Sequence, residues 1–154
     1  MAKTSDGTIE KIISDNRKAR HDYFFLEFWE AGISLKGSEV KSCREGNANL
    51  ADSYAHPKGD ELYLMNAHIA PYLQANQFNH EPKRDRKLLL HKQEIFRIQG
   101  KLNAGGLTLV PVKMYFKDGK IKLELALAKG KKHYDKREDI KKRDIERELK
   151  KERY

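Results

Sequence analysis

The stretch LTLVPVKMYFKDGKIKLELALAKG, residues 107–130, constrains the fold more than any other part of the chain. In its second half every other residue is apolar, with Ile121, Leu123, Leu125 and Leu127 alternating with Lys122, Glu124, Ala126 and Ala128. This alternation predicts a strand with one buried face and one open face. Asp118-Gly119 separates it from a second apolar run and is typical of a two-residue hairpin turn. Pro111 cannot donate to a neighbouring strand, so it predicts an edge or a bulge.

Further strands are predicted upstream of this hairpin. Residues 23–35 are dense in aromatic and aliphatic side chains, which favours a strand that bends near Gly32. Residues 49–70 have apolar runs on both sides of a turn at 56–60, which predicts two more strands. The connection over residues 71–86 is polar and irregular.

A short helix is predicted in the segment SEVKSCREGN. Ser38 is a good N-cap for it, and Gly46 is a good end signal. Lys41 and Arg44 share the face of this helix that points to solvent or to a ligand.

A second, amphipathic helix is predicted from Asp85, as its cap, to Gly100, where it frays. Apolar side chains recur every seven positions in this segment, at Leu88, Ile95 and Leu102. Three successive leucines, 88–90, cannot all face one core, so one of them points outward.

These elements add up to about five or six short antiparallel strands with two inserted helices. The pattern favours an oligonucleotide-binding type of antiparallel barrel, with about three helices once the C-terminal segment is counted. A plain antiparallel sheet with helices on one side is the alternative. We expect a loose N-terminus at residues 1–8, the barrel at 9–128 and a basic tail at 129–154.

The tail is almost entirely charged and cannot bury itself. Its aliphatic residues Ile140, Ile145 and Leu149 are five and four positions apart, which on a helix makes a thin, broken stripe. Such a stripe buries too little area to offset the entropy of ordering the segment. The tail is therefore either a solvated extension or a basic segment that folds along a nucleic acid.

The net charge of +9 favours a polyanionic partner, and nucleic acid is the first expectation. The chain has no apolar stretch of membrane-spanning length, and residues 1–13 have no signal-peptide run. Its single cysteine, Cys43, excludes an internal disulfide. These features suit a cytoplasmic protein that does not bind a membrane.

Catalytic and cofactor signatures are absent from the sequence. None of the six histidines stands at metal-ligand spacing with Cys43 or with another histidine, and there is no glycine-rich phosphate loop. His21-Asp22 would point to opposite faces of a strand, so the two side chains are not expected to act together. We expect no catalytic residue and no cofactor, although a metal-free ribonuclease stays open as an alternative.

The segment NRKARHDY is the clearest binding signal. Arg17, Lys18 and Arg20 can bind phosphates, and the neighbouring Asn16 can reach a base edge or a 2′-hydroxyl. The alternative is an ordinary charged entry to the following strand.

Four motifs together resemble one family, the bacterial SsrA-binding protein SmpB. They are NRKARHDYFF, EAGISLKGSEVKSCREGNANLADSYA, RKLLLH and AKGKKHYDKR, in this order and spacing. The resemblance implies an oligonucleotide-binding barrel that binds the tRNA-like domain of transfer-messenger RNA (tmRNA). It also implies delivery of alanyl-tmRNA, with elongation factor Tu, to ribosomes stalled without a stop codon.

Carried over by position, the resemblance implies RNA-binding roles for Asn16, Glu30, Leu89 and Lys122. Arg17, Lys18 and Arg20 lie in the same basic stretch, and we add Lys41 and Arg44 as tmRNA-binding candidates. Glu30 is unexpected, because a carboxylate repels phosphate; it could accept from a 2′-hydroxyl or a guanine edge, or orient an arginine.

In the tail the resemblance implies contacts with 16S rRNA at the decoding centre and in the empty mRNA channel, where the segment becomes helical. The residues that match this motif are Gly130, Lys131, Lys132, Asp135, Lys136 and Arg137. Position 134, which the resemblance leads us to expect as histidine, is Tyr134 here and follows His133, and we add both as candidates. Either ring of His133-Tyr134 could stack on a ribosomal base. An adaptor of this kind is the leading interpretation, and a general ribosome-associated or single-strand-binding module is the second.

Overall fold

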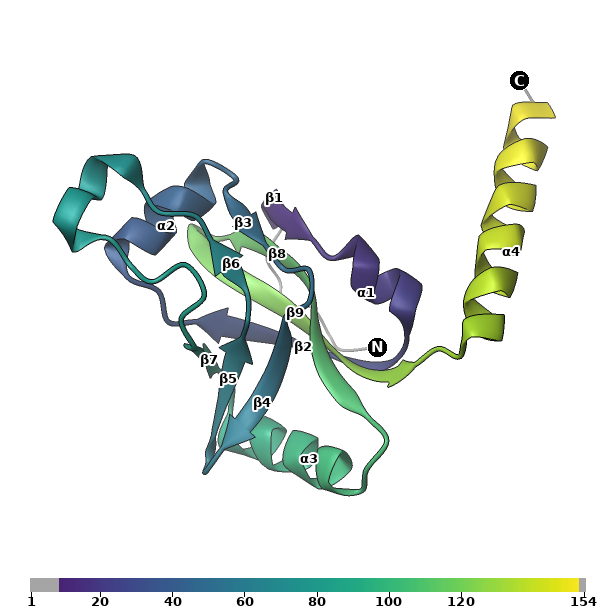
Figure 1. The fold of residues 1–154 in the computed structure, drawn as a ribbon. Coiled ribbons are helices and arrows are strands. Elements are labelled where there is room, and N and C mark those ends of the chain that lie inside the picture. Colours follow the sequence, from purple (N-terminus) through teal and green to yellow (C-terminus); the bar gives the residue numbers. More distant parts are fainter. Residues whose placement is uncertain (1–8, 153–154) are drawn as a thin grey trace.

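The computed structural model describes residues 9–152, and these form a mainly antiparallel β-structure with four α-helices and one 3-10 helix (Figure 1). The first elements are β1 (Ile9–Asp15), α1 (Arg17–Asp22), β2 (Tyr23–Ile33), α2 (Gly37–Arg44), β3 (Ala48–Asn49), β4 (Tyr54–Lys58) and β5 (Glu61–Met65). They are followed by β6 (His68–Ile69), η1 (Leu73–Phe78), β7 (Arg86–Leu89), α3 (Lys92–Asn103), β8 (Thr108–Lys117), β9 (Lys120–Gly130) and α4 (His133–Glu152). The expected loose N-terminus at 1–8 lies outside the described residues.

The strand pairings run in a circuit. The main sheet has the order β1-β8-β4-β5-β7-β2-β9, and β9 also pairs with β8. From β8 the hydrogen-bonded neighbours therefore lead through β4, β5, β7, β2 and β9 back to β8, with β1 added outside this circuit. All these pairings are antiparallel, as the alternating sequence predicts.

The hairpin of β8 and β9 is confirmed. Lys117 pairs with Lys120, and the turn residues Asp118 and Gly119 have φ values of 51° and 73°. Two successive positive φ values are what a tight hairpin turn with the right twist requires. The ladder shifts register between Pro111 and Lys113, which confirms a bulge at the proline.

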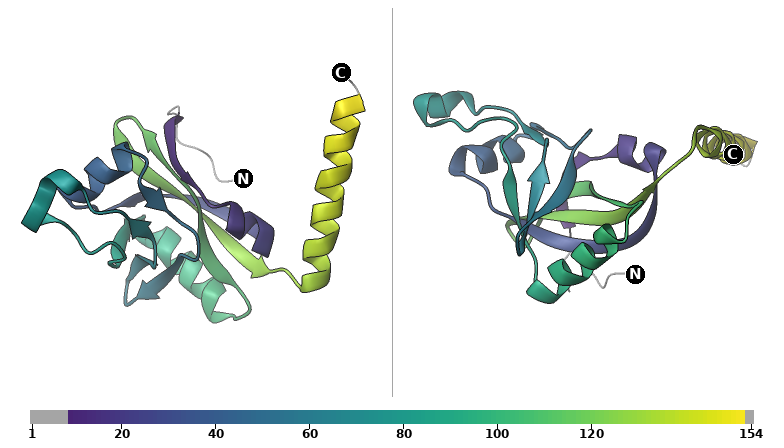
Figure 2. Two further views of the ribbon diagram at one scale, coloured as in Figure 1. Left: turned by 45° about the horizontal axis from the view of Figure 1, so that its top comes forward. Right: turned by 60° about the horizontal axis from the view of Figure 1, so that its bottom comes forward.

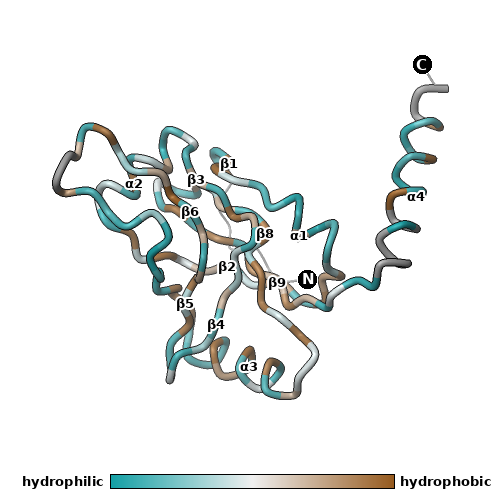
Figure 3. The backbone as a smooth tube through the Cα atoms, in the orientation of Figure 1, coloured by the Kyte–Doolittle hydropathy of each residue, from teal (hydrophilic) through white to brown (hydrophobic). Residues whose placement is uncertain are grey.

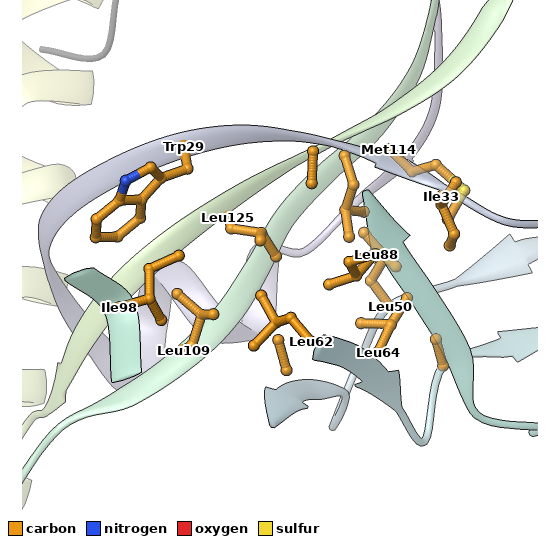
Figure 4. Packing of buried hydrophobic residues seen from close by; sticks show 14 of the residues in the cluster. Trp29, Ile33, Leu50, Leu62, Leu64, Leu88, Ile98, Leu109, Met114 and Leu125 are labelled. Atoms are coloured by element: carbon orange, nitrogen blue, oxygen red, sulfur yellow. The ribbon is translucent and has the colours of Figure 1, made fainter. Parts of the chain in front are cut away.

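The core lies inside the circuit, where Trp29, Leu62, Leu88, Leu109 and Leu125 pack together with further apolar residues (Figure 4). A second, smaller apolar cluster lies on the outer side of β9. There Ala19 of α1 packs with Val110, Val112, Ala126 and Ala128. The prediction of one open face on β9 is wrong at Ala126 and Ala128, because both are buried in this cluster, against which Tyr23, Phe25 and Phe28 also pack.

Two predicted helices begin elsewhere than expected, and one helix was not predicted. The unpredicted helix is Arg17–Asp22, which leads directly into β2 and whose N-cap residue has a side chain that satisfies the first turn. In α2 the N-cap is Lys36 and not Ser38, since the Glu39 carboxylate accepts from the Lys36 backbone N–H at 2.8 Å.

The predicted helix from Asp85 is also wrong in its first part. Residues 86–89 form strand β7, and α3 begins only at Lys92, with His91 as its N-cap. It then continues past Gly100 to Asn103. The apolar repeat every seven residues from Leu88 matched a helix by spacing alone, whereas Leu88 is held by strand pairing with Leu62 and Ile33.

The C-terminal helix α4 projects away from the sheet in all the views (Figure 2). The part of it that is coloured in Figure 3 is mostly hydrophilic, and Ile140, Ile145 and Leu149 are 44%, 57% and 54% exposed. The broken stripe therefore buries little, as predicted. That this segment is disordered in the free protein stays a prediction. Among the described residues no helix is long and apolar enough to cross a membrane.

Candidate nucleic-acid interface

Asn16 holds the basic helix α1 in place. Its Oδ1 accepts from the Ala19 backbone N–H at 3.1 Å, and its Nδ2 donates to the Pro111 carbonyl at 2.8 Å. Nδ2 also approaches the Leu50 carbonyl at 3.3 Å, and the residue is only 3% exposed. A direct contact between the Asn16 side chain and RNA would require this cap to open.

The cations of α1 point outward. Arg17, Lys18 and Arg20 are all exposed. Lys18 forms an ion pair with Asp52 at 2.5 Å, and Arg20 forms one with Asp15 at 2.6 Å. Ion pairs of this exposure contribute little to stability, so both cations can turn toward a phosphate at small cost.

A pocket of about 190 Å³ lies beside α1. Its lining includes Lys18, Tyr23, Asp52 and Tyr54. It is large enough for a few water molecules or one small planar group. His21 and Asp22 follow on the same helix, and their side chains meet at 3.0 Å. The expectation that they point apart is wrong, because it assumed a strand.

Glu30 lies on the outer side of β2, opposite Glu124 of β9. Its Oε2 accepts from the Tyr115 hydroxyl at 2.5 Å and from Lys117 Nζ at 3.1 Å. Burial, followed by the hydrogen bond to Glu30, raises the pKa of Tyr115 far above its usual value. The tyrosine therefore stays protonated and donates.

Leu89 and Lys122 belong to one row of residues across three strands. Gly32 of β2 pairs with Leu89 of β7 on one side and with Lys122 of β9 on the other. Leu89 is 52% exposed while its neighbour Leu88 is 1% exposed, so the prediction of one outward leucine is confirmed. A Cβ at Gly32 would come within 3.2 Å of Leu89 Cβ, so the glycine leaves room for this side chain.

Lys41 and Arg44 lie on the exposed face of α2, as predicted. The Lys41 ammonium is 5.5 Å from the centre of the Tyr72 ring, and the Arg44 carbonyl accepts from Lys11 at 2.8 Å. In Figure 1, α2 lies at the opposite end of the molecule from α1. The structure thus separates these two candidates from the α1 cations.

The tail begins beside α1. The Lys131 backbone N–H donates to the Asp22 carbonyl at 2.8 Å, and its Nζ reaches the Arg20 carbonyl at 3.3 Å. The same ammonium is 5.0 Å from the Phe24 ring centre. Gly130 and Lys132 flank Lys131, and all of the tail motif after Lys132 lies in the first turns of α4. Arg137 is exposed there.

With this geometry in view, comparison with known families is decisive. Residues 13–154 match the model of the family described as SmpB protein. The chain belongs to the SmpB family. The match spans the sheet, α1 and the tail helix.

Curated relatives in the SmpB family are similar over nearly the whole chain. The SsrA-binding protein of Desulforudis audaxviator is 62% identical over 140 residues, which cover 91% of this chain and 92% of the relative. The SsrA-binding protein of Carboxydothermus hydrogenoformans is 62% identical over 143 residues, covering 93% and 96%. That of Agrobacterium fabrum is 56% identical over 147 residues, covering 95% and 92%.

A solved structure is also similar in fold. A chain from the work described as "tmRNA-SmpB: a journey to the center of the bacterial ribosome" superposes with a TM-score of 0.66 at 50% identity. The match covers 82% of this chain and 92% of that chain. The SmpB resemblance drawn from four sequence motifs is thus confirmed.

Sequence reasoning missed Tyr115, Lys117 and Asp52, which contact the predicted residues. No local signal marks them, because their partners are more than 30 positions away: 85 for Tyr115, 87 for Lys117 and 34 for Asp52. Among the residues whose side chains the structure describes, no group of three or more histidine, cysteine or acidic side chains is arranged to hold a metal ion.

Proposed function

We propose that this member of the SmpB family is a tmRNA-binding adaptor in trans-translation. It binds the tRNA-like domain with its body and delivers alanyl-tmRNA, together with elongation factor Tu, to stalled ribosomes. It carries no catalytic activity of its own. Because ribosomes translate in the cytoplasm, the role also places the protein there.

One observation carries this proposal: predicted RNA contacts from four separate segments meet on one side of the sheet. Ala126 and Ala128 of β9 face α1, and by alternation Lys122 faces the same side of that strand. Lys122 pairs with Gly32, which in turn pairs with Leu89. Arg17 and its neighbours, Glu30, Leu89 and Lys122 therefore lie along one outer surface, with cations for phosphates and an apolar side chain for a base or ribose.

The circuit of strands supports the further proposal that the body is an oligonucleotide-binding barrel. Proteins with such barrels bind nucleic acid on an outer sheet face, and the surface defined by α1, β2, β7 and β9 would serve this purpose. Lys41 and Arg44 on α2 add a second basic patch away from it.

The tail supports the adaptor part of the proposal. It starts next to α1 and then leaves the sheet, so the body and the tail can contact two different RNAs at once. On a stalled ribosome the tail would enter the empty mRNA channel. Its motif from Gly130 to Arg137 would contact 16S rRNA in the decoding centre. A helix with exposed cations along its length gains counter-charge from the surrounding rRNA.

A binding titration tests the proposal. The full-length protein is titrated with the tmRNA tRNA-like domain and with ordinary alanine tRNA, each at two salt concentrations. We expect a preference for the tRNA-like domain that persists at the higher salt, because shape recognition does not depend on counterion release. Equal binding that collapses with salt would contradict the proposal and favour a general RNA-binding module. Cleavage of the RNA would instead favour a ribonuclease.

A further inference from the structure

Glu30 is an acidic side chain on the surface that we propose for RNA. It faces a second carboxylate, Glu124, directly across the β2–β9 ladder. Like charges at such a position destabilise a sheet unless a cation lies between or beside them. A free carboxylate there would also repel the phosphates that the neighbouring cations attract.

Two side chains from β8, Lys117 and Tyr115, offset the charge of the Glu30 carboxylate and fix its orientation. Lys117 Nζ lies 3.3 Å from Oε1 and 3.1 Å from Oε2, so its charge is shared between both oxygens. The Tyr115 hydroxyl adds a hydrogen bond of 2.5 Å to Oε2. Both partners are buried, with Tyr115 at 2% and Lys117 at 3% exposure. The carboxylate is therefore neutralised and held in one orientation.

The burial of Lys117 separates its role from that of an ordinary phosphate-binding lysine. Its side chain is covered, whereas the Glu30 side chain keeps 20% of its surface exposed. An approaching RNA would meet the oxygens of Glu30 before it met the ammonium. What Glu30 offers at this point is a hydrogen-bond acceptor whose own charge is offset by the buried ammonium of Lys117.

We propose that Tyr115 and Lys117 are positioning residues, which fix the Glu30 carboxylate so that it accepts hydrogen bonds from N–H or O–H donors of the RNA. This inference rests on the proposed function. Of the O–H and N–H donors that RNA offers, we assign the 2′-hydroxyl and the 2-amino group of guanine as the ones that meet Glu30. Phosphate offers none, so the acceptor favours one placement of the RNA over others on a surface that otherwise attracts any polyanion.

A double-mutant cycle on the full-length protein tests the coupling. Glu30→Gln, Tyr115→Phe and the double variant are titrated with the tRNA-like domain. We expect each single change to weaken binding about 3- to 10-fold, since Glu30→Gln replaces one acceptor oxygen by a donor NH2 group and Tyr115→Phe leaves the carboxylate free to turn. The double variant should bind no worse than Glu30→Gln alone, because Tyr115 acts only through Glu30. Independent, multiplying losses would overturn the inference.

The salt dependence distinguishes positioning from phosphate binding. Lys117→Gln should weaken binding while leaving the slope of log affinity against log salt unchanged. Lys122→Gln, on the open side of β9, should lower that slope by about one unit. A slope that falls equally for Lys117→Gln would show a direct phosphate contact and overturn the inference.

A matched control is available on β5. The Tyr63 hydroxyl donates to Glu61 at 2.8 Å, so Tyr63→Phe removes a tyrosine–glutamate hydrogen bond of the same kind. Tyr63→Phe should change the affinity for RNA by the same factor whether or not Glu30→Gln is also present. Thermal unfolding of every variant checks that the sheet is intact. If the weaker binding of Tyr115→Phe only reflected a smaller fraction of folded protein, the inference would be overturned.

Synthetic RNAs identify the donor. Single 2′-deoxy and single inosine substitutions are scanned through the tRNA-like domain. If Glu30→Gln no longer weakens binding to an RNA with one 2′-deoxy substitution, the hydroxyl at that position is the donor. If it no longer weakens binding to an RNA with one inosine, the amino group of that guanine is the donor. A penalty that survives every substitution would overturn the inference. Failure of the unsubstituted protein to bind the tRNA-like domain would overturn the proposed function as well.

Discussion

Glu39 and Arg86 are both completely buried, and Arg86 Nε donates to Glu39 Oε2 at 2.5 Å. The other guanidinium nitrogens of Arg86 donate to the carbonyls of Ala67 at 2.8 Å and Pro82 at 3.0 Å. Arg84 Nη2 binds the second oxygen of Glu39 at 2.5 Å. This network joins α2 to β7 and to the loop before it, and so fixes the strand that presents Leu89.

Replacing Glu39 by glutamine should destabilise the protein strongly. The shape is kept, but Arg86 is left as a buried charge without its counter-ion, which costs about 3–5 kcal/mol. Urea unfolding at pH 7 measures this loss. The control is Glu61→Gln, which breaks an ion pair between two half-exposed side chains and should change stability very little. Equal effects of the two changes would contradict the prediction.

The same network should make stability depend on pH below 4.5. Burial raises the pKa of Glu39, but hydrogen bonds from Arg84, the Lys36 backbone and Arg86 outweigh it and hold the pKa below its ordinary value of 4.5. A carboxylate whose pKa is lower in the folded state contributes to stability at pH values above its unfolded-state pKa. This contribution is lost as the pH falls through the folded-state pKa. Wild-type stability should therefore fall on acidification below pH 4.5, and Glu39→Gln should show a shallower fall.

Asn16→Ala should destabilise the protein by about 1–3 kcal/mol, because it removes the cap of α1 and leaves the Pro111 carbonyl without its donor. Chemical unfolding measures the change. Arg17→Ala, at the next position and exposed, should alter stability by less than about 0.5 kcal/mol. If Arg17 contacts a phosphate, Arg17→Ala should also lower the slope of log RNA affinity against log salt by about one unit.

Leu89→Ser should weaken binding to the tRNA-like domain without unfolding the protein. The side chain is half exposed, so its removal changes stability little, while an apolar contact with a base or ribose is lost. Titration should show a loss of about tenfold. Leu73→Ser is the control, because Leu73 is 84% exposed on η1, outside the proposed surface. A similar loss for both variants would argue against a specific contact at Leu89.

Ending the chain at Lys132 should separate the two halves of the proposed function. The contacts of Lys131 with α1 are kept, and the described aliphatic residues that are removed with α4, which are Ile140, Ile145 and Leu149, are about half exposed. Binding to the tRNA-like domain should stay within about twofold, whereas tagging on stalled ribosomes should be abolished. A large loss of affinity in the truncated protein would show that the tail takes part in tmRNA binding.

The local pattern predicted much of the fold but failed where two patterns compete. The hairpin of β8 and β9 follows from alternation and the Asp118-Gly119 turn, which depend only on residues close in sequence. The leucines from Leu88 fit a helix and a strand equally well. Pairing with β5 and β2 decides for a strand, and that pairing involves residues far away in the chain.

The sequence alone favoured a nucleic-acid partner and determined the antiparallel hairpin and the inability of the tail to bury itself, because charge, alternation and composition are local properties. Only the tertiary structure decided that Asn16 is a buried cap, 95 positions from the carbonyl that it binds, and that Glu30 meets a tyrosine 85 positions away. Contacts of that range depend on strand register and on the bulges within the ladders. The register emerges from the packing of the whole sheet, so the residues beside Asn16 and Glu30 in the sequence do not reveal these partners, although Pro111 did mark one bulge.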